Sequence, residues 1–132
     1  MARRNNPYRQ YQQNQIETAD QGALILMMFE GALKFINQAK EAINKKDIVG
    51  AHKSINRAQD IVVELMCSLD LEAGEVAGNL FRLYDYTYHQ LKEANLQKKV
   101  EPAEEAEKVL TSLRESWEQV VKGEAQGVSS GT

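Results

Sequence analysis

The stretch Glu17–Ile43, ETADQGALILMMFEGALKFINQAKEAI, predicts a long helix around which the rest of the chain is arranged. Thr18 with Gln21 forms a capping box, and Asp20 is a second candidate N-cap. Apolar residues then recur at steps of three and four in two stripes: Ile25, Met28, Ala32, Phe35, Ala39 and Ala42, and Leu26, Phe29, Leu33, Ile36 and Ile43. A helix on one side of a bundle needs an apolar stripe only about 100° wide, but residues 24–29 are apolar nearly all round. This helix is therefore expected either at the centre of a bundle or with a second face that binds a partner.

Three more helices are predicted in the rest of the chain. Asp47 caps the second, Ile48–Leu69. The third covers Glu75–Leu96, and the fourth covers Pro102–Val121, with proline in its first turn and Gly123 after its end. Their expected inward faces are Ile48, Ala51, Ile55, Ala58, Val62, Leu65 and Leu69; Val76, Ala77, Leu80, Tyr84, Tyr88, Leu91 and Ala94; and Ala106, Val109, Leu110, Leu113, Trp117 and Val120.

These lengths and connections predict an all-α fold. Four helices joined by loops of about 3–7 residues pack as antiparallel neighbours, so the expected architecture is an up-down-up-down four-helix bundle with a flexible N-terminal arm. The expected divisions are the arm over 1–16, the bundle over 17–122 and a disordered tail over 123–132, which is rich in Gly, Ser and Ala.

Length and composition exclude several classes of protein. A chain of 132 residues is expected to form one domain with its own core. Its net charge of −3 does not suggest a binder of nucleic acid or of membrane surfaces, and no apolar run approaches the roughly 20 residues of a membrane span. The N-terminus lacks the apolar region of a secretory signal peptide, and the single cysteine, Cys67, excludes an intrachain disulfide. Both features fit a reducing cytosol, with Cys67 expected as a buried thiol in an apolar helical run.

No metal, cofactor or catalytic motif is predicted. Bundles that hold two metals place a Glu three residues before a ligand His, but here Val49 precedes His52 and Tyr86 precedes His89. No Gly-rich phosphate loop or Ser/His/Asp arrangement is present in the sequence. The chain is therefore not expected to be an enzyme.

One enzyme-like pattern remains as an alternative. Arg82 and His89 lie two helical turns apart, like the Arg…His pair of small helical ribonucleases of the HEPN type, in which Arg stabilises a phosphate and His moves a proton. Asp85 could hydrogen-bond to His89, which is the usual arrangement of a surface pair. No basic RNA-binding track accompanies these residues.

The first three helices carry more large apolar side chains than a single core can use. The positions expected to line a groove for a partner are Ile25, Met28, Phe29, Ile61, Leu65, Phe81 and Tyr84. Core packing is the alternative for each of them, and a generic helical adaptor or dimerisation module is a further alternative function. The arm adds Tyr8, Tyr11 and Ile16, either within a solvated tail or as anchors that cover the groove when no partner is bound.

Several of these segments together resemble one family, the flagellar secretion chaperones (FliS). YQQNQIETA at residues 11–19 is similar to the family's Y-x-x-N-x-[IV]-E-T-A, and Leu24–Leu33 is similar to its L-[IL]-x-M-[LF]-[YF]-[DE]-G-A-[LI]. Further matches are Ala58–Ile61, Glu64-Leu65, Ser68–Asp70, Asn79-Leu80, Leu83–Tyr86, Ala94-Asn95 and Leu113–Trp117. The resemblance runs from Tyr8 to Val121. The family usually has Ser-Pro where this chain has Asp20-Gln21, a change at the start of the helix and not in the groove.

The resemblance implies a cytosolic four-helix bundle that binds the disordered C-terminal segment of flagellin. Such binding prevents premature polymerisation and keeps flagellin competent for flagellar type III secretion. Other flagellar export or regulatory proteins are further candidate partners, and the resemblance implies no cofactor.

Overall fold

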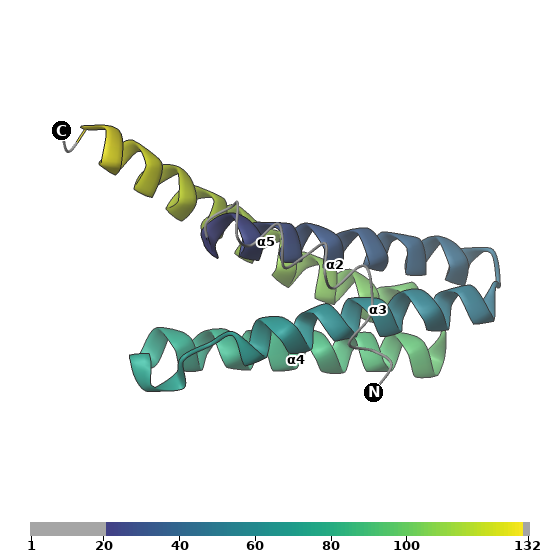
Figure 1. Ribbon diagram of the computed structural model, residues 1–132. Helices are drawn as coiled ribbons and strands as arrows, with labels where there is room; N and C mark the ends of the chain where they lie inside the picture. The colour runs from purple at the N-terminus through teal and green to yellow at the C-terminus, as the bar shows by residue number, and fades with distance from the viewer. Residues whose placement is uncertain (1–20, 131–132) are drawn as a thin grey trace, which may run out of the picture.

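The computed structural model describes residues 21–130, with side-chain environments over 21–123, and this range is helical apart from its short connections. The elements are α2 (Gln21–Asn44), α3 (Ile48–Cys67), the short 3-10 helix η2 (Leu71–Ala73), α4 (Glu75–Gln97) and α5 (Val100–Ser130). Each α-helix packs against its neighbours in the chain, and α5 returns beside α2, which closes a ring of four helices (Figure 1). The predicted four-helix bundle is confirmed.

Two helix boundaries follow the sequence signals directly. Asp47 begins α3 as predicted, because its Oδ1 accepts a hydrogen bond from the Gly50 amide at 3.0 Å. The first helix of the bundle, α2, ends at Asn44, one residue beyond the stretch that the sequence predicts as helical. The candidate N-caps Thr18 and Asp20 lie outside the described residues.

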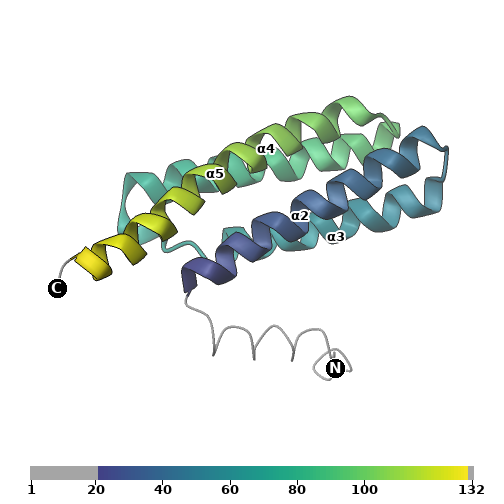
Figure 2. The same ribbon diagram turned by 90° about the horizontal axis from the view of Figure 1, so that it is seen from above.

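The fourth helix is longer than predicted. It begins at Val100 and continues to Ser130, whereas the sequence predicts a start at Pro102, an end before Gly123 and a disordered tail beyond. An interior glycine costs a helix only about 1 kcal/mol relative to alanine. No proline follows Gly123 to interrupt the backbone hydrogen bonds. The predicted end of this helix before Gly123 is therefore wrong, and α5 extends beyond the ends of the other helices (Figure 2).

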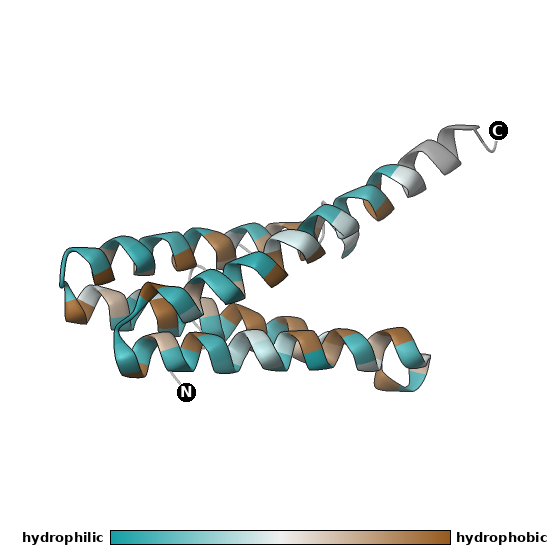
Figure 3. Cartoon of the chain, turned by 180° about the vertical axis from the view of Figure 1, so that it is seen from behind, coloured by the Kyte–Doolittle hydropathy of each residue, from teal (hydrophilic) through white to brown (hydrophobic). Residues whose placement is uncertain are grey.

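The core consists of the inward stripes that the periodicity predicts. Its buried members are Phe29, Ala32, Ile36 and Ala39 from α2; Ile55, Ala58, Val62 and Leu65 from α3; Tyr84, Leu91 and Ala94 from α4; and Ala103, Ala106 and Leu110 from α5. Thr87, which an apolar pattern does not select, is also fully buried, and its Oγ1 donates to the Leu83 carbonyl at 2.8 Å. A hydroxyl can enter an apolar face when it bonds to its own helix in this way. Figure 3 shows the resulting alternation of apolar and polar residues along the helices.

Three residues expected in the core are exposed because they lie where no neighbouring helix covers them. Ile48 is the first residue of α3 and is 63% exposed, and Val76, the second residue of α4, is 72% exposed. Val120, one turn beyond Trp117 on α5, is 46% exposed. Helical phase selects a face of a helix but does not say where the neighbouring helix stops. The core prediction is wrong at these three positions.

Charged side chains join α2 to α5. Lys40, which interrupts an apolar stripe of α2, reaches Glu107 on α5, with Nζ 2.7 Å from Oε1. Arg114 on α5 lies 3.7 Å from Glu30 of α2. Because these side chains are partly exposed, each pair contributes no more than about 1 kcal/mol. Together they make the α2–α5 edge of the bundle polar.

The substitutions Gly50→Ala and Gly78→Ala are expected to change the free energy of unfolding by different amounts. A Cβ at Gly50 would collide with the Asp47 carboxylate that caps α3, whereas a Cβ at Gly78 in α4 meets open space. Gly78→Ala is expected to raise the free energy of unfolding by about 0.5–1 kcal/mol through helix propensity. Gly50→Ala makes the same gain but loses about 1 kcal/mol of capping, so no net stabilisation is expected. Urea unfolding of both variants measures the difference, and equal stabilisation by both would show that the cap contributes nothing.

Candidate functional site

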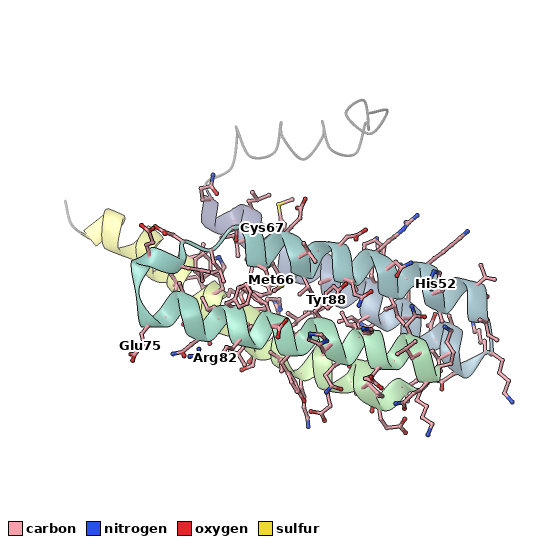
Figure 4. All side chains as sticks on the ribbon, turned by 90° about the horizontal axis from the view of Figure 1, so that it is seen from below. His52, Met66, Cys67, Glu75, Arg82 and Tyr88 are labelled. Atoms are coloured by element: carbon pink, nitrogen blue, oxygen red, sulfur yellow. The ribbon has the colours of Figure 1, made fainter. Side chains whose placement is uncertain are left out.

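A groove lies between α3 and α4, toward the end of the bundle where η2 connects them. It has a volume of about 490 Å3 and is lined by Val63, Met66, Cys67 and Leu69 on one side and by Phe81, Asp85, Tyr88 and His89 on the other. Figure 4 shows Met66 and Tyr88 between the two helices. This α3–α4 groove is apolar apart from Asp85 and His89, which form a pair with 3.4 Å between Oδ1 and Nε2. The Asp85–His89 contact expected on one helix face is therefore present.

The position of the groove follows from where α3 and α4 are bridged by polar groups. The His52 ring, near the start of α3, lies 3.0 Å from the Asn95 amide, and Gln59 Nε2 donates to the Tyr88 carbonyl at 3.3 Å. Within the described residues no such hydrogen bond joins α3 to α4 beyond Gln59. The interface beyond Gln59 is therefore open and apolar.

The groove rests on well-packed core. Met66, Leu69 and Tyr88 are partly buried and pack against the buried cluster. Beneath them the rings of Phe29 and Tyr84 meet with centroids 6.3 Å apart. Burial raises the pKa of Tyr84 to about 12, so its hydroxyl stays neutral at physiological pH. These packed core residues support the exposed residues that line the groove and hold them in one arrangement.

The predicted site residues fall into four groups. Phe81 lines the α3–α4 groove. Ile25, Met28 and Ile61 are partly buried and pack against the core. Phe29, Leu65 and Tyr84 are buried, with 2%, 0% and 4% exposure. Tyr8, Tyr11 and Ile16 lie outside the described residues.

Phe29, Leu65 and Tyr84 do not line the surface of this structure, and their contact with a client stays a prediction. All three occupy inward positions of their helices, where the neighbouring helices cover them completely. They support the groove from below and do not form its surface.

Sequence reasoning missed most of the lining that the structure reveals. Val63, Met66 and Cys67 do fall outside the regular inward stripe of the second helix, so their excess apolar character was a usable signal. Cys67 is exposed at the last position of α3, and the prediction of a buried thiol is wrong. A residue with apolar neighbours in the sequence stays exposed when no other helix packs against its side of the helix. Tyr88, which was expected in the core, packs against it and also lines the groove.

Arg82 and His89, the two residues of the ribonuclease-like pattern, each contact other side chains. The Arg82 guanidinium donates to Asn79, and His89 faces Asp85 and the edge of the Tyr88 ring. No hydrogen bond between Arg82 and His89 exists in the described structure. Among residues 21–130 no three His, Cys, Asp or Glu side chains are grouped to hold a metal ion, and none of the helices has both the length and the apolar character of a membrane span.

Comparison with known proteins identifies the family of this chain. The family model described as "Flagellar protein FliS" matches residues 4–124. The flagellar secretion chaperone FliS of Bacillus subtilis is 36% identical over 119 residues, covering 90% of this chain and 89% of that protein. FliS of Campylobacter jejuni is 36% identical over 121 residues, covering 91% and 94%. A crystal structure of a bacterial flagellar chaperone shares the fold, with a TM-score of 0.73 at 19% identity over 89% of this chain and 96% of that one. This chain belongs to the FliS family of flagellar secretion chaperones.

Proposed function

We propose that this protein binds the C-terminal segment of flagellin in the cytosol and holds it in the α3–α4 groove before export. Bound flagellin cannot polymerise prematurely and stays competent for flagellar secretion. The supporting observation is an open apolar groove of about 490 Å3 on a bundle of this chaperone family. Large apolar surfaces on a folded chain mark binding sites for partners.

The chemistry of the groove suits a client that is unfolded in solution. Val63 is 40% exposed, and Met66 offers a flexible thioether that adapts to differently shaped side chains. A client helix or extended segment contributes apolar anchors to this surface and becomes ordered as it binds. Asp85 and His89 at the rim offer polar partners that set its orientation.

The apolar surface continues around α3 toward α2. Met27 on α2 is 40% exposed, and the partly buried Ile25 and Met28 lie on the same helix. Ile61 contacts α2 closely, because its Cδ1 lies 3.3 Å from where a Cβ of Gly31 would stand. The second half of α3 therefore has Ile61 on its α2 side and Val63 on its α4 side. A client segment laid across α3 contacts both sides, and Ile25, Met28 and Ile61 form its second line of contacts.

The arm is the proposed cover for this surface in the absence of flagellin. Tyr8, Tyr11 and Ile16 supply apolar anchors on a segment tethered to the start of α2. A short tether gives the arm an effective concentration on the order of mM, enough for a weak intramolecular contact. Flagellin then displaces the arm, and its affinity falls only by the fraction of time the groove is covered.

The single cysteine reports directly on groove occupancy. Cys67 is exposed in the groove lining, so a maleimide reagent labels only this position. A C-terminal flagellin peptide at about ten times its Kd is expected to slow labelling about tenfold, because only the free fraction reacts. Deleting residues 1–15 is expected to speed labelling of the free protein.

The matched control is a peptide of the same composition in scrambled order. Titration calorimetry at several temperatures measures binding in parallel, and burial of the apolar surface should give a negative heat-capacity change. Tight binding with undiminished Cys67 labelling would place the client elsewhere on the bundle. Binding without a heat-capacity change that disappears in moderate salt would argue against apolar burial altogether.

A further inference from the structure

The opposite end of the bundle, where the α2–α3 and α4–α5 turns lie together, is basic (Figure 1). Residues 45–53 and 92–101 contain six lysines, Lys45, Lys46, Lys53, Lys92, Lys98 and Lys99, against three acidic residues, Asp47, Glu93 and Glu101. Their local net charge of +3 has the opposite sign to the −3 of the whole chain. The groove end is acidic by contrast, with six acidic residues and one arginine between residues 60 and 85.

These lysines are not used by the fold as ion-pair partners. In the described part of the chain none of the six forms a salt bridge, and Lys98 bonds instead to the backbone and side-chain oxygens of Asn95, at 2.7 and 2.6 Å. Lys46 and Lys98 also hold left-handed backbone conformations, with φ of 62° and 53°. A side chain in that region costs roughly 1–2 kcal/mol that glycine avoids. Both turns thus carry a lysine where glycine would be the more stable choice.

Three exposed apolar residues lie among these lysines. Ile48, Val49 and Leu96 are 63%, 65% and 70% exposed. The hydrogen bond between His52 and Asn95 holds the start of α3 against the end of α4, which brings Val49 and Leu96 to the same region. Figure 4 shows His52 toward this end of α3, away from Met66 and Cys67. These three residues and the six lysines are called the basic end patch.

We propose that the basic end patch docks an acidic amphipathic segment of a second protein while flagellin occupies the α3–α4 groove. Such a segment covers Ile48, Val49 and Leu96 with its apolar face, and its carboxylates meet the ring of lysines. The groove is lined on α3 from Val63 onward and on α4 between Phe81 and His89, whereas the patch lies at the start of α3 and the end of α4, so the two sites can be filled at once. The proposal goes beyond flagellin binding, since it concerns another partner at another surface.

Two other occupants fit the patch less well. A uniformly anionic membrane would repel Asp47, Glu93 and Glu101, which are interspersed among the lysines, whereas a protein segment can pair with both signs. A second copy of this chain could present its acidic end. That contact joins two different surfaces, so it would extend into open chains of molecules and not close into a discrete assembly.

The test uses the full chain and a fluorescent synthetic helical peptide with leucines on one face and glutamates on the others. Reversing Lys45, Lys46 and Lys99 to glutamate is expected to weaken binding at least about 30-fold, because it replaces attraction by repulsion. Leu96→Ser is expected to weaken it about fivefold through lost apolar contact. Reversing Lys34, Lys108 and Lys122 makes the same change of net charge elsewhere and should alter binding no more than about twofold at physiological salt.

Lys46→Gly separates docking from folding. It removes a charge and relieves the left-handed backbone strain, so the melting temperature should be unchanged or higher while peptide binding weakens. Prior saturation with flagellin peptide should leave these results unchanged.

Three results would overturn the proposal. The first is equal loss of binding in the control triple variant, which would mean bulk electrostatics. The second is tighter binding of vesicles rich in anionic lipid than of the peptide through the same lysines. The third is concentration-dependent association in sedimentation that the Lys45, Lys46 and Lys99 reversals abolish, which would make a second copy the occupant.

Discussion

Replacing Trp117 by alanine is expected to lower the free energy of unfolding by about 3 kcal/mol. Trp117 on α5 is partly buried and packs against the core cluster, and its Nε1–H donates to the Gly22 carbonyl at 2.8 Å. That hydrogen bond joins residues 95 positions apart and ties α5 to the first turn of α2. Truncation removes both the contacts of the ring and this hydrogen bond between the two helices. Urea unfolding monitored by far-ultraviolet circular dichroism measures the loss.

Trp117→Phe is the matched control, since it keeps an aromatic ring but removes the N–H donor and part of the indole. A loss of at least about 1 kcal/mol is expected, because the hydrogen bond is missing. The difference between the two variants then reports the packing of the ring that phenylalanine keeps. If Trp117→Ala unfolds like the wild type but no longer binds flagellin peptide, the ring belongs to the binding surface and α5 is more than a closing helix.

The fold could be predicted because its determinants are local. Steps of three and four in the apolar pattern and the Asp47 cap specify helices whose short connections leave few ways to pack. The length of α5 could not be predicted in this way. Gly123 favours the end of a helix, but no stronger helix-breaking residue follows it. A glycine inside a helix costs only about 1 kcal/mol relative to alanine, which is too little to end α5 by itself.

The sequence indicates that an apolar binding surface exists, but it does not indicate which residues line it. An excess of apolar residues on the second half of α3 is visible in the sequence, but which of them stay open depends on which neighbour covers each side. Ile61 is covered because Gly31, without a side chain, lets α2 approach it closely. Val63 remains exposed because the hydrogen bonds from α3 to α4 lie at Gln59 and earlier, one turn or more before it. Such pairings join residues that are distant in sequence, so no periodicity within one helix reveals them.

Val63→Asp is expected to weaken binding of the flagellin peptide at least about 30-fold, which corresponds to about 2 kcal/mol. Val63 lines the α3–α4 groove and is 40% exposed in the free protein, so a carboxylate there remains solvated until a client covers it. Binding would then bury an unpaired charge against apolar side chains, which costs several kcal/mol unless the client rearranges. The folded state itself loses little, because the position is open to solvent.

Val120→Asp provides the matched control. It introduces the same residue at a valine of similar exposure, 46%, on α5 and away from the groove. Its affinity for the peptide should stay within about twofold of the wild type. The peptide affinity of Val63→Ala should lie between those of Val63→Asp and Val120→Asp, with about a fivefold loss from the removed methyl groups. Fluorescence anisotropy with a labelled flagellin peptide ranks the three variants, and melting curves confirm that all are folded. Equal effects of aspartate at Val63 and Val120 would mean that the client does not lie in the α3–α4 groove, and the binding surface would then have to be sought on another face of the bundle.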